Sequence, residues 1–152
     1  MRLEPALGQS IVDRMMQAIP YNINIMNEHG YIIASGDKSR INTLHVGSLD
    51  SIKSGQTLPM LHSHGNHGQP GVNMPVKFKK KIIGVVGITG DPNTVTRLAS
   101  LLKVATELLI SQSYNNQMRE KHKNRLNRFL YQWLEVTDDI KNHPDLVSEA
   151  AS

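Results

Sequence analysis

The sequence predicts a single α+β domain, because two β-hairpins lie between segments with helical periodicity. The clearest hairpin lies in residues 71–92, GVNMPVKFKKKIIGVVGITGDP. Residues 72–78 alternate apolar and polar side chains, whereas residues 82–89 form a nearly unbroken run of Ile, Val and Gly. Alternation is typical of a half-buried strand, and an unbroken apolar run indicates a central strand covered on both faces. We expect this hairpin to form one wall of any binding site.

Three glycines, two in the second strand of this hairpin and one directly after it, remove side chains where the backbone passes close to something else. Gly84, Gly87 and Gly90 make room for a neighbouring backbone or for a ligand, and the sequence leaves both alternatives open. The lysines at 79–81 predict a solvated turn. Asp91-Pro92 then supplies a capping residue and a proline at the first helical position, which predicts that a helix begins there.

The segment before the second hairpin contains one helix, a first hairpin and several short elements. Apolar residues recur at helical spacing over residues 3–19, with Pro5 allowed only in the first turn and Pro20 ending the pattern. We expect this helix to pack on the core, with a dimer contact as the alternative. The patterns further predict strands over 21–27 and 31–35, a capped turn over 37–40, a near-surface segment over 41–46, a short helix over 49–53 that ends at Gly55, and a short strand over 57–61.

A strongly apolar helix face covers residues 93–109 and continues at looser spacing towards Leu134, as one long helix or two in tandem. Its length indicates packing against another chain. The basic run between residues 119 and 128 is best explained as a solvated face. A nucleic-acid contact is the alternative, although no helix-turn-helix pattern accompanies the run. Residues after Thr137 are polar and are expected to form a flexible tail.

Composition limits the compartment and the chemistry. The chain has 152 residues, a net charge of +4 and no cysteine, which excludes disulfides and thiolate metal sites and fits a cytoplasmic protein. No apolar run approaches the roughly 18 residues of a membrane span, and no signal-peptide pattern begins the chain. His62, His64 and His67 lie in one glycine-rich loop, but their spacing does not match a metal site. We therefore predict a polar loop there, no metal and no cofactor.

No catalytic motif occurs in the sequence, so an enzyme is not expected. The two hairpins instead carry side chains that donate hydrogen bonds. An arginine offers a planar fork for a carboxylate, and His, Asn, Ser and Thr add further donors. This inventory suits a small, anionic, hydroxylated ligand. The residues concerned are Ser35, Arg40, Asn42, His45, Asn73 and Thr89.

Four segments carry a family resemblance, in this order: LEPALGQSIVDRMM, YNINIMNEHGYIIASGDKSRINTLHVG, PGVNMPVKFKKKIIGVVGITGDP and TRLASLLKVATELLI. Over about residues 3–134 the chain resembles the N-terminal sugar diacid recognition domain of bacterial carbohydrate diacid regulators. The resemblance implies a PAS-like (PDC-type) sensor fold, in which a central antiparallel sheet is flanked by an N-terminal helix and a long C-terminal helix. It also implies a ligand such as glycerate, glucarate or galactarate.

Carried over position by position, the resemblance nominates a ligand site. Together with Ser35 from the donor set, the site residues are Arg40, His45, Gly71, Val72, Asn73, Ile88, Thr89 and Gly90. The family pattern has Gly where this chain has Asn42. The family's C-terminal helix-turn-helix does not occur in these residues, so we expect DNA contact only through such a domain.

The predicted organisation is a sensor domain over 1–112, a signalling or dimerisation helix over 113–136, and the polar tail over 137–152. The leading hypothesis is a homodimeric ligand sensor that signals through its C-terminal helix. The alternative is a structural or dimerisation module without a functional pocket.

Overall fold

The structure is a computed structural model that describes residues 2–60 and 70–142, with side chains up to residue 133. The chain divides into two compact units, residues 1–111 and residues 112–152. The three histidines of the 62–67 segment lie outside the described residues. Within the described residues, no helix is long and apolar enough to cross a membrane.

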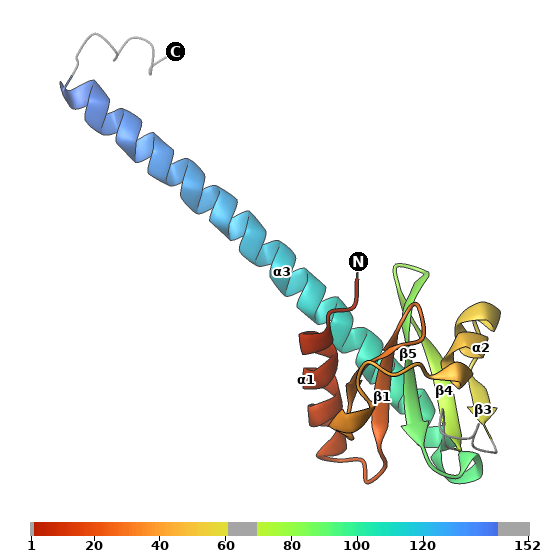
Figure 1. The fold of residues 1–152 in the computed structure, drawn as a ribbon. Coiled ribbons are helices and arrows are strands. Elements are labelled where there is room, and N and C mark those ends of the chain that lie inside the picture. Colours follow the sequence, from red (N-terminus) through yellow and green to blue (C-terminus); the bar gives the residue numbers. More distant parts are fainter. Residues whose placement is uncertain (1, 61–69, 143–152) are drawn as a thin grey trace. The chain divides into compact units, whose positions relative to one another are not determined.

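The first unit is built on a five-stranded antiparallel sheet with strand order β2-β1-β5-β4-β3 (Figure 1). This arrangement, with a helix before the sheet and a long helix after it, confirms the predicted fold. The elements are α1 (Pro5–Met16), β1 (Ile23–Asn27), β2 (Ile32–Ser35), the short 3₁₀ helix η1 (Lys38–Arg40), α2 (Val46–Ser54), β3 (Leu58–Met60), β4 (Gly71–Phe78), β5 (Lys81–Thr89) and α3 (Pro92–Asn142).

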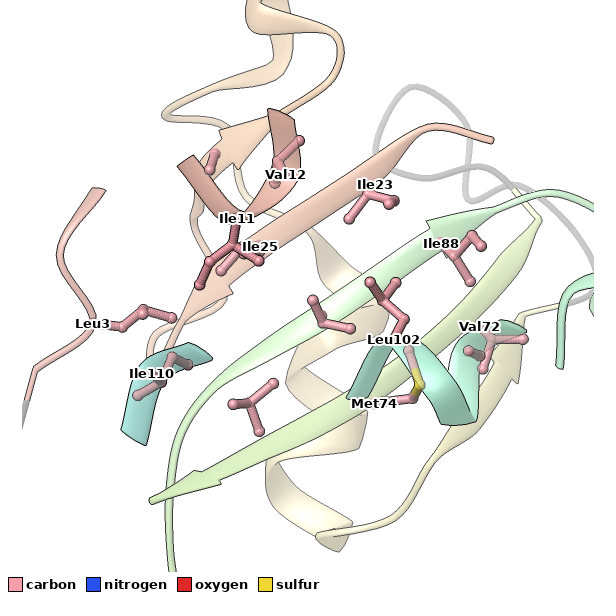
Figure 2. Packing of buried hydrophobic residues seen from close by; sticks show 14 of the residues in the cluster. Leu3, Ile11, Val12, Ile23, Ile25, Val72, Met74, Ile88, Leu102 and Ile110 are labelled. Carbon is pink, nitrogen blue, oxygen red and sulfur yellow. The ribbon is translucent and has the colours of Figure 1, made fainter. Parts of the chain in front are cut away.

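One face of the sheet packs against α1 and the first part of α3. Figure 2 shows this cluster, in which Ile11 of α1 and Leu102 of α3 lie with Ile25, Val72 and Ile88 of the strands. These side chains alternate along each strand with the residues of the opposite face, as the pleat requires. The larger core of the unit therefore lies between the sheet and these two helices.

The opposite face of the sheet is covered as well. Met26, Ile32 and Val85 form a second buried cluster, against which Ile52 of α2 packs. β5 is central and buried on both faces, as predicted. The prediction that residues 72–78 are only half-buried was wrong, because six consecutive residues of β4 are buried. The alternation of apolar and polar residues identified the strand. It does not reveal that α2 covers the second face of the sheet, which buries the residues expected to face solvent.

Local signals set most of the helix ends. Pro5 stands in the first turn of α1, and Asp91 Oδ1 accepts a hydrogen bond from the Asn93 backbone N–H at 3.1 Å at the start of α3. α2 ends at Gly55, whose φ of 69° is left-handed. It begins at Val46, three residues before the predicted start, because His45 caps it.

Asn42 has a φ of 72°, in the left-handed region that glycine adopts without strain. Asn is one of the few other residues that enter this region readily. The replacement of the family's usual Gly by Asn42 is therefore compatible with the loop. The Asn42 N–H donates to the Ile32 carbonyl at 2.8 Å, which ties the loop to β2.

The second unit is formed by the continuation of α3, which is one helix over residues 92–142 rather than two in tandem. Most of its described side chains are exposed. The first part of the predicted polar tail, residues 137–142, belongs to this helix, and the remainder lies outside the described residues.

Candidate functional site

Three neighbouring strands place two asparagines on either side of a glycine. Gly87 of β5 pairs with Asn24 of β1 on one side and with Asn73 of β4 on the other. All three lie on the α2 face of the sheet, because their neighbours Ile23, Val72 and Ile88 belong to the core cluster of the other face. A missing side chain between two polar ones leaves a hollow with hydrogen-bonding walls.

The hollow has a water-accessible volume of about 10 Å³, which is room for about one water molecule. It is lined by residues of β1, β4 and β5, by one residue of the edge strand β3 and by the residue that caps α2. They are Asn24, His45, Met60, Gly71, Val72, Asn73, Gly87, Ile88 and Thr89. Six of these nine were predicted from the sequence, so the fold brings most of the candidate site together.

The Asn73 side chain lies between two glycines. A Cβ added to Gly87 would be 2.8 Å from Asn73 Oδ1, and one added to Gly47 would be 2.9 Å from Asn73 Nδ2. Asn73 is 4% exposed, yet no hydrogen bond to its side-chain amide occurs within residues 2–60 and 70–133. An amide that lines a hollow without a protein partner is suited to a bound ligand or water.

His45 contributes a donor whose tautomer is set by helix capping. Its Nδ1 accepts a hydrogen bond from the Ser48 backbone N–H at 3.2 Å, so neutral His45 carries its proton on Nε2. His45 is 4% exposed, whereas the other residues of the segment 41–46 are exposed or partly buried, so the predicted near-surface segment contains one buried side chain. The cap holds the imidazole at the hollow.

Ser35 acts on Asn24 rather than lining the hollow. Its hydroxyl donates to Asn24 Oδ1 at 2.5 Å, and Asn22 Nδ2 donates to the same oxygen at 3.1 Å. Ser35 Oγ also accepts from the Asp37 N–H at 3.0 Å. With the Asn24 oxygen occupied by two donors, its Nδ2 is the group that can donate further.

The remaining predicted residues lie outside the hollow or present their backbones to it. Arg40 ends η1 and is not among the lining residues. Gly90 follows Thr89 and donates its N–H to the Pro70 carbonyl at 2.8 Å, beside the hollow. The side chains of Val72 and Ile88 are part of the core cluster, so these residues shape the site through backbone. The role of Arg40 stays a prediction.

Sequence reasoning did not nominate Asn24, Met60 and Gly87 as site residues. The sequence did carry a signal for Asn24, because it is a polar residue within the apolar strand β1, whose first four residues are all buried. The sequence indicated that Gly87 makes room for a neighbouring group, but it did not identify that group as the Asn73 amide. Met60 comes from an edge strand of three residues, too short for a periodic signal.

The electrostatics near the site are modest. The pKa of Asp37 lies below its usual value because its carboxylate accepts hydrogen bonds from the Ser39 hydroxyl and backbone N–H, with Arg40 adding a smaller attraction. Among the described residues, no group of three or more His, Asp or Glu could hold a metal ion.

A larger hollow lies at the other end of β1 and β5, lined by residues that include Arg2, Glu28, His29 and Lys81. These four side chains are exposed. His29 and Glu28 lie 3.5 Å apart as a surface pair. Exposed charged side chains of this kind are well solvated, so this hollow is the weaker candidate for a specific site.

Comparison with known proteins places the chain in a family. Residues 3–133 match the family described as "Putative sugar diacid recognition". The chain is 35% identical over 116 residues to the carbohydrate diacid regulator of Escherichia coli K12, an alignment that covers 73% of this chain and 30% of that protein. The chain spans about a third of the length of the curated relatives it matches, between 30% and 38%.

Two solved structures share the fold at low sequence identity. One is the Escherichia coli DhaR(N)-DhaL complex, with a TM-score of 0.53 and 17% identity over 82% of this chain and 53% of that one. The other is the GAF domain of an Acinetobacter phosphoenolpyruvate-protein phosphotransferase, with a TM-score of 0.51 and 11% identity over 74% of this chain and 86% of that one. They show a GAF-like fold. By its match over residues 3–133, the chain belongs to the sugar diacid recognition family.

Proposed function

We propose that this chain is the ligand-sensing part of a bacterial transcription regulator and that it binds a small hydroxy-acid or sugar diacid. The observation that carries the proposal is the Asn73 amide, which lines the hollow and makes no hydrogen bond to the side chains and backbone that the structure describes. His45 and Thr89 line the same hollow and add donors for a carboxylate or hydroxyl. The family and the name of the Escherichia coli relative support sugar diacids as the ligand class, and glycerate is a further candidate from the sequence resemblance.

Binding requires the hollow to open, because it has room for about one water molecule. Met60 is the lining residue best suited to move, since its unbranched side chain has several rotatable bonds and it belongs to the edge strand β3. A ligand that fits only the opened hollow would shift the population towards that state.

The same strand that lines the hollow leads into α3. Ile88 and Thr89 line the hollow, and α3 begins at Pro92, three residues after Thr89. A displacement at Thr89 therefore reaches the first turn of α3 through Gly90 and Asp91. In our proposal the occupied site signals through this helix, and the active form is a homodimer.

Calorimetry with glycerate, glucarate and galactarate tests the proposal. We expect wild type to bind at least one of them and Asn73→Ala to bind it at least about tenfold more weakly, the loss expected when a hydrogen bond to a charged group is removed. Arg40→Ala tests the predicted role of the guanidinium in the same experiment. Succinate, a diacid without hydroxyl groups, controls for charge alone.

The second candidate is a structural or dimerisation module without a working pocket. It is favoured by one observation, the small volume of the hollow. If none of the acids binds to the wild-type chain, this second function replaces the first. Binding that Asn73→Ala leaves unchanged would instead locate the ligand elsewhere.

A further inference from the structure

The part of helix α3 that belongs to the first unit has a second apolar face, which the rest of that unit leaves exposed. In the first unit, Leu101, Val104 and Leu108 are 69%, 55% and 65% exposed. They alternate with Leu102, Thr106 and Ile110, which are buried in the core. Val104 and Leu108 each lie two residues from a buried position, about 200° around the helix. A helix that buries one face and exposes a second apolar face is typical of a partner surface.

The second unit carries the same kind of side chain at the same spacing. From Leu101 the sequence steps by three and four residues through 104, 108, 111, 115, 118 and 122, the heptad pattern of a two-stranded coiled coil. A step of four to 126 then shifts the pattern, which continues through 129 and 133. The positions are Leu101, Val104, Leu108, Ser111, Asn115, Met118, His122, Leu126, Phe129 and Trp133, and we call them the α3 seam.

We propose that the α3 seam pairs with the seam of a second copy of this chain, parallel and in register. This proposal deepens the homodimer of the proposed function and does not depend on which ligand is bound. Eight large apolar residues, those of the seam and Leu130, are between 48% and 69% exposed. At about 200 Å² for a fully exposed large side chain, they expose roughly 900 Å² per copy, against about 800 Å² per partner in a standard interface.

The polar seam positions define the register. In an in-register parallel pair, each residue of the seam faces its own counterpart, so Asn115 faces Asn115 and the two amides can hydrogen-bond. A slip by one heptad would bury Asn115 against Leu108 instead, leaving a polar group against an apolar one. The seam therefore favours one register over its neighbours.

The charges beside the seam give this arrangement a measurable signature. Five basic residues and Glu120 lie between 119 and 128, and an in-register parallel pair brings the two basic segments together. Repulsion between like charges is screened by salt. Association of the parallel pair should therefore strengthen as salt is raised. The basic residues are Arg119, Lys121, Lys123, Arg125 and Arg128.

Sedimentation equilibrium of the full chain tests the surface. We expect a dimer for wild type, and at least about a tenfold higher Kd for Leu108→Lys, because each dimer loses two buried leucines. Phe129→Lys should weaken the dimer as well. Tyr131→Lys is the matched control, since Tyr131 is 71% exposed but lies away from the seam, and it should leave Kd unchanged.

Cross-linking tests the register, because the natural chain has no cysteine. Oxidation should join two copies of Asn115→Cys and not two copies of Asn116→Cys, which lies off the seam. A wild-type chain that stays monomeric at about 100 μM overturns the proposal. So does a dimer that Leu108→Lys and Phe129→Lys leave intact, or one in which both cysteines cross-link equally. Calorimetry on the same samples reports ligand binding separately, so failure of the dimer and failure of sensing are distinguishable.

Discussion

The substitution Gly87→Ala tests the hollow most directly, because it moves Asn73 without changing it. The new Cβ would be 2.8 Å from Asn73 Oδ1 and 3.2 Å from Met26 Cε. Ordinary contact begins at 3.4 Å, so the amide must move by about 0.6 Å or rotate out of place. Crowding of this kind costs about 1–3 kcal/mol, and replacing a strand glycine returns about 0.5–1 kcal/mol.

The expected loss of stability is therefore small, about 0–2.5 kcal/mol, while the loss of affinity is large. A hydrogen bond to a charged group contributes about 1.5–3 kcal/mol, so displacing the amide should weaken binding of a carboxylate ligand by about 10- to 150-fold. Urea unfolding measures the loss of stability. Calorimetry at a temperature where the variant is folded measures the loss of affinity.

Gly84→Ala is the matched control on the same strand. Its Cβ would be 2.5 Å from the Met26 carbonyl oxygen, so it should destabilise the fold while leaving Asn73 in place. Affinity should then stay near the wild-type value for Gly84→Ala and fall for Gly87→Ala. Equal affinity in wild type and Gly87→Ala would refute the argument, since the position of the Asn73 amide would then not matter.

Three further predictions concern the loop after β2 and the cap of helix α2. Asn42→Ala should lower the free energy of unfolding by about 1 kcal/mol and Asn42→Gly should not, because φ is 72° there; chemical denaturation distinguishes them. His45→Ala should cost about 1 kcal/mol through loss of the α2 cap, whereas His45→Asn keeps a capping side chain and removes the imidazole from the hollow, so it should be more stable than His45→Ala and still lose affinity. The lowered pKa of Asp37 means that its contribution to stability is complete above the ordinary value of 3.8 and is lost as the pH falls through the folded-state pKa. An NMR titration that finds the Asp37 pKa at or above its ordinary value would contradict this.

The elements that depend on local chemistry were predictable from the sequence. Pro5 and Asp91-Pro92 act within one helical turn, and both mark the helix starts seen in the structure. β5 was recognised as central from its apolar run alone. The start of α2 was missed because its cap is a histidine, which is not among the residues that usually fill this position.

The structure brings six of the nominated residues together around one hollow, and their binding of a ligand stays a prediction. His45, Asn73 and Thr89 were nominated and do line one hollow. Ser35 was nominated too, but its hydroxyl positions Asn24. The difference arises because alternation tells which residues share a face of one strand, and only pairing between strands tells which residues stand side by side.

The sequence by itself determined the strands, the turns and the starts of α1 and α3, because these depend on residues close together in the chain. Only the tertiary structure decided that Asn24, Gly87 and Asn73 align across three strands, and that α2 covers the sheet face on which they lie. Register between strands is set by the packing of both faces at once. The role of Gly87, which is to make room for the Asn73 amide, is therefore visible only when β4 and β5 are paired.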